Sequence, residues 1–227
     1  MPPSAQNICF ILLPGFAPDH VPVLALKQAL AKRGYAVIAS NFFGDSTIDD
    51  FRKLSIEQCR ENISGLINNT AAKYDRVIGI GVSLGGALFL ECAKTNNDLS
   101  GIVSIGTPFR LKFRGPMRVG EFLLPFIYPV WRKLEKNKSW RLLPIGAGPA
   151  VIHYLENEFL DGLESIRCPV LFMHSKKDLV TDYRALDEYS KKISSGQKEV
   201  ILSENGNHVI DYNPDFIFDR LVKFFNL

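Results

Sequence analysis

The pentapeptide Gly81-Val82-Ser83-Leu84-Gly85 constrains this chain more than any other segment. The apolar run 76–80 before it predicts a buried strand, and the stretch 86–94 after it predicts a helix. A strand, a Gly-x-Ser-x-Gly turn and a helix form a nucleophile elbow, in which small residues let the strand and the helix approach closely. Such a turn holds the serine hydroxyl above the sheet edge, beside the positive end of a helix. Ser83 is therefore the candidate nucleophile, in a position that suits acyl transfer.

Short apolar runs alternate with longer amphipathic stretches along the chain, without an internal repeat. We expect strands at 8–13, 35–40, 77–80, 101–105, 170–174 and 199–202, and helices at 21–33, 55–73, 86–94, 183–193 and 214–225. This alternation predicts an α/β fold with a mostly parallel sheet and helices on both faces. The 227 residues suffice for a single domain, 1–227, with a full core. Active groups in such a sheet gather in loops at the carboxyl ends of the strands.

The segment from about 109 to 163 interrupts this alternation and is too long for an ordinary connection. We expect it to project over the carboxyl ends of the strands as a cap or lid. Between residues 110 and 141 it carries nine Lys or Arg and only two Glu, which allows a weak contact with an anionic lipid surface. Its apolar side chains either pack on the core or line a substrate pocket, and both interpretations stay open. The candidate pocket residues are Phe109, Met117, Phe122 and Phe126.

A serine hydroxyl is a poor nucleophile unless a neighbouring base takes its proton. The chain has four histidines. His208 lies in the polar loop 204–210, between the last predicted strand and the last predicted helix, where it could reach the elbow. We therefore interpret His208 as the general base. His20, His153 and His174 are interpreted as ordinary surface or core residues, although His174 could support the neighbouring acid loop from behind.

The base in turn needs an ionised carboxylate that holds its tautomer and stabilises the imidazolium. Asp178 is the best candidate, because the loop 175–180 follows a predicted strand at the same edge of the sheet. Two lysines directly before it would help to keep its carboxylate ionised. The rival acids are Asp182, Asp187 and Asp211, of which Asp182 is the most serious.

A tetrahedral intermediate also needs hydrogen-bond donors for its oxygen anion, and backbone N–H groups usually supply them. One donor is expected from Leu84, directly after the nucleophile. The other is expected from the loop 13–17 after the first strand, with the N–H of Phe16 as the candidate. The alternative is that Pro14-Gly15 forms only a turn.

Four motifs together point to a known family: 13–16 (Leu-Pro-Gly-Phe), 81–86, 174–178 and 206–210. With them the chain resembles small bacterial carboxylesterases and monoacylglycerol lipases of the α/β-hydrolase superfamily, over nearly its whole length except the insert. The order serine, acid, histidine is that of α/β-hydrolases. The resemblance implies the same nucleophile, base, acid and N–H donors, and a cap over an acyl-chain pocket. One departure is Pro14-Gly15, where the group often has His-Gly, which leaves the shape of this loop open.

The expected function is hydrolysis of carboxylic esters, with short to medium acyl chains or a monoacylglycerol as the small-molecule substrate. No metal or organic cofactor is needed for it. The alternatives are a thioesterase, an amidase or a carbon–carbon bond hydrolase with the same three residues, because a fold does not determine its substrate. A hypothesis from another class is a non-catalytic module that binds a lipid surface or a partner through the basic insert.

Composition limits the remaining possibilities. A formal charge of +3 is too small to indicate nucleic-acid binding. The apolar run 8–13 is too short for a signal peptide or a membrane span and lacks a basic region before it. Without a convincing targeting segment, we expect a cytoplasmic location. The four cysteines show no metal-ligand spacing, which favours buried thiols in a reducing compartment. The sequence does not indicate the oligomeric state.

Overall fold

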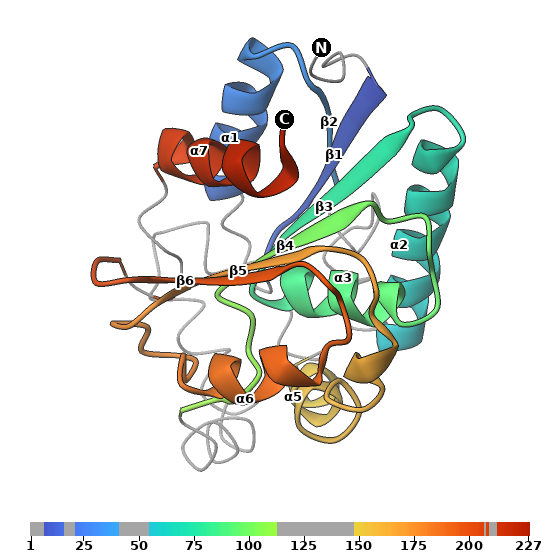
Figure 1. Ribbon diagram of the computed structural model, residues 1–227. Coiled ribbons are helices and arrows are strands. Elements are labelled where there is room, and N and C mark those ends of the chain that lie inside the picture. Colours follow the sequence, from blue (N-terminus) through green and yellow to red (C-terminus); the bar gives the residue numbers. More distant parts are fainter. Residues whose placement is uncertain (1–6, 16–20, 41–54, 113–147, 207, 209–212) are drawn as a thin grey trace, which may run out of the picture.

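The computed structural model describes residues 7–15, 21–40, 55–112, 148–206, 208 and 213–227. Their strands form one six-stranded parallel sheet in the order β2-β1-β3-β4-β5-β6 (Figure 1). The strands are β1 (Ile8–Leu13), β2 (Ala36–Ala39), β3 (Arg76–Val82), β4 (Gly101–Ile105), β5 (Val170–Ser175) and β6 (Lys198–Ser203). The helices are α1 (Val21–Lys32), α2 (Ile56–Ala71), α3 (Leu84–Ala93), α5 (Gly148–Asn157), α6 (Ala185–Lys192) and α7 (Pro214–Phe225), with a short 3-10 helix η5 (Leu163–Ser165). The predicted α/β fold is confirmed.

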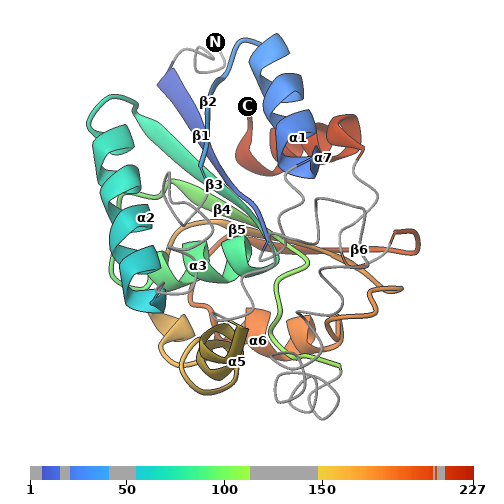
Figure 2. The same ribbon diagram turned by 180° about the vertical axis from the view of Figure 1, so that it is seen from behind.

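Helices cover both faces of the sheet (Figures 1 and 2). α1 and α7 lie together on one face, and α2, α3, α5 and α6 lie on the other. Successive side chains of a strand point to opposite faces. In β1, Phe10 and Leu12 therefore belong to the core cluster beneath α1 and α7, whereas Ile11 and Leu13 belong to the cluster beneath α2 and α3. Burial on both faces explains why the central strands are continuous apolar runs rather than alternating ones.

Polar residues mark where two of these helices begin. The Ser55 hydroxyl accepts a hydrogen bond from the N–H of Gln58 at 3.1 Å and caps α2. The side chain of Asn213 caps α7 in the same way, and Pro214 is the first residue of that helix. Proline suits this position because its missing N–H would have no partner inside the helix. Both helices therefore start where the sequence predicts, within one residue.

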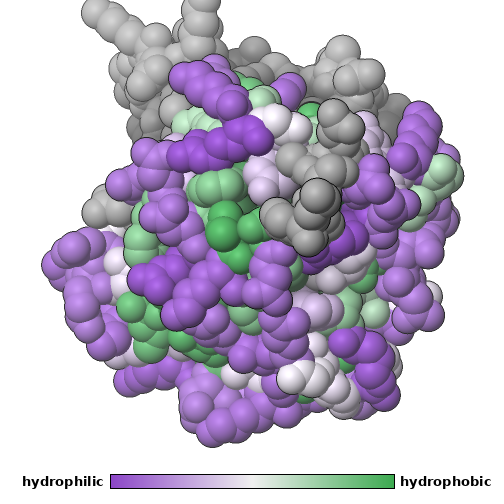
Figure 3. Space-filling view, turned by 45° about the horizontal axis from the view of Figure 1, so that its top comes forward, coloured by the Kyte–Doolittle hydropathy of each residue, from purple (hydrophilic) through white to green (hydrophobic). Residues whose placement is uncertain are grey.

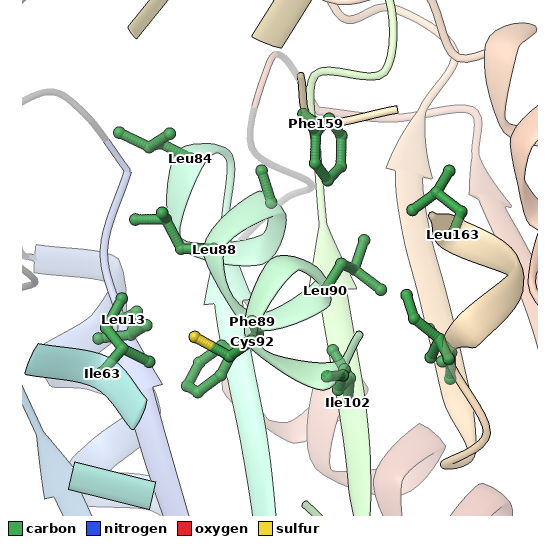
Figure 4. Packing of buried hydrophobic residues seen from close by; sticks show 14 of the residues in the cluster. Leu13, Ile63, Leu84, Leu88, Phe89, Leu90, Cys92, Ile102, Phe159 and Leu163 are labelled. Atoms are coloured by element: carbon green, nitrogen blue, oxygen red, sulfur yellow. The ribbon is translucent and has the colours of Figure 1, made fainter. Parts of the chain in front are cut away.

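The helix α3 is buried on almost every side (Figure 4). Leu84, Leu88 and Leu90 pack against the surrounding elements, and Phe159 and Leu163 lie close to its outer side (Figure 4). A helix that is apolar all round is a core helix, and displacing it would expose much of this cluster to water. The turn that leads into α3 is consequently anchored to the centre of the molecule.

Of the predicted cap, residues 113–147 lie outside the described residues. Its described flanks, 109–112 and 148–163, pack on the main fold. Phe109 is 2% exposed and contacts the rings of Phe159 and Phe172. In α5, which the sequence did not predict, the Tyr154 hydroxyl donates a hydrogen bond to Glu91 of α3 at 3.1 Å.

Hydrophilic residues cover most of the described surface on the face shown in Figure 3, and hydrophobic residues show in limited areas, one near its centre and another toward its lower left. In the part of the chain that the structure describes, no helix has both the length and the apolar composition that crossing a bilayer requires.

Candidate active site

Ser83 occupies a sharp turn between the end of β3 and the start of α3. Its backbone has φ 51° and ψ −117°, a conformation that residues with a side chain rarely adopt. The N–H of Ser83 donates to the carbonyl of Ile105 at 2.7 Å, which ties the turn to the end of β4. Backbone strain of this kind persists only where the surrounding structure enforces it, and it is frequent at functional sites.

Close backbone approach explains the glycines around Ser83. A Cβ atom on Gly81 would lie 2.4 Å from the backbone of Gly85, and one on Gly85 would lie 2.5 Å from the carbonyl oxygen of Pro14. A Cβ atom on Gly15 would lie 3.3 Å from the Ser83 Cβ, so the loop after β1 runs directly beside the serine. Any side chain at Gly81 or Gly85 would therefore force the strand, the helix and this loop apart.

Ser83, His208 and Asp178 form one continuous line of hydrogen bonds, although they are far apart in the sequence. His208 Nε2 lies 2.9 Å from Ser83 Oγ, and His208 Nδ1 lies 2.9 Å from Asp178 Oδ2. The three residues follow β3, β6 and β5, so all of them lie at the carboxyl edge of the sheet. This is the geometry in which a histidine can take the proton of a serine hydroxyl.

The Asp178 carboxylate is fully buried and receives several hydrogen bonds. Its Oδ1 accepts the N–H groups of Val180 at 2.7 Å and Thr181 at 2.9 Å. Burial alone would favour the neutral acid, but hydrogen bonds from His174, His208 and Thr181 outweigh this effect and hold the pKa of Asp178 well below its usual value. The carboxyl group is therefore ionised at neutral pH despite its burial.

The rival acids have other partners or lie outside the described residues. The carboxylate of Asp182 accepts two hydrogen bonds from the Arg184 guanidinium, at 2.8 and 2.9 Å, and these hold the pKa of Asp182 below its usual value. Asp187 pairs with Lys191 at 2.8 Å on α6. Asp211 is not among the described residues. The structure thus places His208 against Asp178, while the Asp182 carboxylate is bound by an arginine.

The expected oxyanion donors are described only in part. Leu84 is the first residue of α3, where backbone N–H groups have no acceptor within the helix. Phe16 lies outside the described residues, although Gly15 directly before it lies beside Ser83.

Three of the predicted pocket residues, Met117, Phe122 and Phe126, lie outside the described residues. The fourth, Phe109, is packed against Tyr189. Contact of these residues with a substrate stays a prediction.

Sequence reasoning did not detect that the first residues of the insert are attached to the acid loop. Leu111 and Thr181 form an antiparallel bridge, flanked by hydrogen bonds from the N–H of Lys112 to the Val180 carbonyl at 2.9 Å and from the N–H of Asp182 to the Arg110 carbonyl at 2.8 Å. The ammonium group of Lys112 also donates to the carbonyl oxygen of Asp178. The base of the insert therefore helps to hold the acid loop in place.

The buried thiols are unsuited to act as nucleophiles in place of the serine. Burial raises the pKa of Cys59 to about 12 and that of Cys92 to about 11, so both remain protonated at neutral pH. Only the thiolate is strongly nucleophilic. Within the described ranges, no group of three or more His, Cys, Asp or Glu residues is arranged to hold a metal ion.

Gly106 limits the position of His208, and we expect Gly106→Ala to impair the site. Gly106 has φ +59°, and a Cβ atom there would lie 2.5 Å from the backbone oxygen of His208. The variant should lose about 1–3 kcal/mol of unfolding free energy, or shift the histidine loop and with it the contact of His208 with Ser83. Chemical denaturation measures the first effect, and labelling of Ser83 by a fluorophosphonate measures the second. Gly196→Ala, which meets no atom within 4 Å, is the matched control, and equal effects in the two variants would contradict this explanation.

Comparison with known proteins agrees with this architecture. The model of the "Alpha/beta hydrolase family" matches residues 10–220. The chain is 26% identical over 222 residues to the thermostable monoacylglycerol lipase of Bacillus sp. (strain H-257), a match that covers 95% of this chain and 89% of the lipase.

Solved structures are similar in fold. The monoacylglycerol lipase of Paleococcus ferrophilus superposes with a TM-score of 0.69 at 19% identity, covering 95% of this chain and 94% of the other. A structure reported for the metagenome-derived lipolytic enzymes LipS and LipT superposes with a TM-score of 0.71 at 18% identity, covering 97% and 94%. At such identities the superpositions support the fold.

Proposed function

Because the chain belongs to the alpha/beta hydrolase family, we propose that it hydrolyses carboxylic esters through an acyl-enzyme on Ser83. The observation that carries this proposal is the line of hydrogen bonds from Ser83 through His208 to Asp178, with both distances at 2.9 Å. The line ends on a buried carboxylate that stays ionised, and it starts at a serine in a strained turn. A serine with no chemical role would need none of these features.

In the proposed reaction, the neutral His208 ring carries its proton on Nδ1, which donates to Asp178, and its Nε2 accepts the hydroxyl proton of Ser83. As Ser83 Oγ attacks the ester carbonyl, this proton moves to Nε2, and the ionised Asp178 stabilises the imidazolium. His208 then gives the proton to the leaving alcohol. A water molecule repeats the sequence on the acyl-enzyme and releases the acid.

The developing oxygen anion would be held by the N–H groups of Leu84 and Phe16. The start of α3 supports the first assignment, since its N–H groups are unpaired within the helix and the helix dipole favours negative charge there. The position of Gly15 against Ser83 supports the second. Removal of one donor from an oxyanion hole typically lowers kcat by about 10²–10³-fold.

For the substrate we propose esters with short to medium acyl chains or a monoacylglycerol. The named relatives that are monoacylglycerol lipases or lipolytic enzymes support this class. The acyl pocket is proposed to be lined by Phe109, Met117, Phe122 and Phe126.

The basic residues between 110 and 141 are proposed to allow weak contact with anionic lipid. A cytoplasmic location is also proposed, and the four free cysteines support it because free thiols are typical of a reducing compartment.

Initial rates on p-nitrophenyl esters from acetate to palmitate, and on the matching 1-monoacylglycerols, test this proposal. We expect turnover with a maximum at short or medium chain length, because a closed apolar pocket accommodates a limited number of methylene groups. Turnover of thioesters or amides alone would replace the ester assignment with one of the alternatives. Absence of turnover on every acyl substrate would contradict hydrolysis as the function.

A further inference from the structure

A second histidine contacts the carboxylate of Asp178, and nothing in the proposed reaction uses it. His174 is the fifth residue of β5 and is 1% exposed. Its Nε2 lies 3.0 Å from Asp178 Oδ2, the same oxygen that faces His208 Nδ1. Thr181 Oγ1 lies 2.5 Å from that oxygen and 2.8 Å from His174 Nε2. One carboxylate oxygen is thus the meeting point of two imidazole rings and a hydroxyl.

The contacts determine which nitrogen of His174 carries the proton. The Thr181 hydroxyl donates its hydrogen to Asp178 Oδ2, so its oxygen is left to accept from Nε2, and the carboxylate can only accept a hydrogen bond. A bare Nε2 would face this anion with a lone pair at 3.0 Å, which is unfavourable. Among the described residues, the opposite nitrogen, Nδ1, is buried without a hydrogen-bond partner. A proton on Nδ1 would be a buried donor with no acceptor, so the neutral ring with its proton on Nε2 fits these surroundings best.

We infer that His174 is a positioning residue for the proposed serine hydrolase, which shares its Nε2–H between Thr181 Oγ1 and Asp178 Oδ2 and thereby controls how strongly this carboxylate attracts the proton of His208. This inference rests on the proposed function. The donor withdraws negative charge from Oδ2, the oxygen that His208 binds, whereas the backbone N–H groups hold the other oxygen, Oδ1.

The ionisable groups around this carboxylate are few in the described part of the chain. His174 on β5 and His208 after β6 contact the carboxylate itself, and Lys112, at the base of the insert, contacts the carbonyl oxygen of the same residue. Removal of the His174 donor leaves only Thr181 and two backbone N–H groups on the carboxylate, which is then held less firmly against His208. The remaining negative charge on Oδ2 then acts more strongly on His208.

The test compares His174→Phe, which keeps a ring but removes the donor, with His174→Gln, which removes the ring but keeps an N–H group. We expect His174→Phe to lower kcat/KM by about 10- to 100-fold, the loss typical of one hydrogen bond to a charged group. The acid limb of its kcat/KM profile, which reports protonation of the base, should move to higher pH. His174→Gln should retain most of the wild-type rate and the wild-type limb.

Opposite results overturn the inference. If the ring only fills space, His174→Phe will be the more active variant, and the acid limb will stay or move to lower pH. Labelling of Ser83 by a fluorophosphonate, followed against pH, gives the same comparison without an ester substrate. A wild-type protein that is neither labelled nor active would contradict the proposed function, whereas an active wild type with an unaffected His174→Phe variant would contradict this inference alone.

A measurement on the unmodified protein keeps the test decisive if His174→Phe does not fold. Long-range ¹H–¹⁵N correlation of the histidine rings identifies the protonated nitrogen of each. We expect a protonated Nε2 and a bare Nδ1 for His174 at neutral pH, and the opposite arrangement for His208. A bare Nε2 on His174 would overturn the inference.

Discussion

Replacement of Ser83 by alanine should lower kcat for ester hydrolysis by about 10⁶-fold, the loss typical of removing the nucleophile from a serine triad. Without Oγ there is no atom to form the acyl-enzyme, and His208 has no hydroxyl to deprotonate. What remains is the contribution of substrate binding and of the oxyanion donors. The measurement is the initial rate on the best p-nitrophenyl ester, with thermal unfolding to show that the variant is folded.

Ser165→Ala is the matched control for this variant. Ser165 is an exposed serine at the end of η5, away from the line of hydrogen bonds, and its replacement should leave the rate unchanged. A folded Ser83→Ala variant that keeps the wild-type rate would show that the hydrolysis proceeds without this serine. A loss that both variants share would indicate damage to the fold rather than to the chemistry.

Asp178→Asn should lower kcat by about 10⁴-fold, because the amide can donate a hydrogen bond where the carboxylate only accepts. His208 would then carry its proton on Nε2, the nitrogen that must receive the proton of Ser83. The carboxylate is ionised in the folded protein, since its pKa lies well below the usual value, so the variant also removes a negative charge that stabilises the imidazolium.

Asp182→Asn provides the comparison for the acid. Its carboxylate lies in the same loop but is bound by Arg184, so we expect a rate within about tenfold of wild type. Rates of the two variants on one ester, with unfolding curves for both, decide between the acids. A larger loss in Asp182→Asn than in Asp178→Asn would show that the acid has been assigned to the wrong residue.

The fold could be predicted because its signals are local. The strand β1 is a run of six apolar residues that is buried on both faces, and Ser55 and Pro214 mark the beginnings of their helices. The elbow around Ser83 is a local signal too, since Gly81 is required by the backbone of Gly85 only four residues later, although Gly85 itself is required by the distant loop after β1. By contrast, α5 was not predicted, although its buried residues Val151, Tyr154 and Leu155 have the i, i+3, i+4 spacing of an amphipathic helix.

The candidate site could be predicted only in part, because much of it depends on contacts between distant segments. Asp178 and Asp182 stand four residues apart in one loop, and nothing in their spacing separates them. The structure distinguishes them through the partners of each, a buried set of donors for Asp178 and Arg184 for Asp182. The attachment of the insert to this loop likewise involves segments about 70 residues apart, for which a sequence pattern carries no signal.

The contact of His174 with the acid illustrates the same limit. Its position at the end of a strand favours burial, but which carboxylate it meets depends on how the following loop turns back over the sheet. That turn is closed by hydrogen bonds of the Asp178 carboxylate to backbone N–H groups two and three residues later. Loop closure of this kind follows from the Asp side chain, while its encounter with a second histidine follows only from the folded arrangement.

The most direct test of the central claim, a serine activated by His208, is reaction with a fluorophosphonate followed by intact mass and peptide mapping. We predict one adduct per chain, located on Ser83, with loss of esterase activity in proportion to labelling and almost no reaction in His208→Ala. An adduct on another residue, or rapid hydrolysis of esters by a protein that the reagent does not modify, would contradict the account.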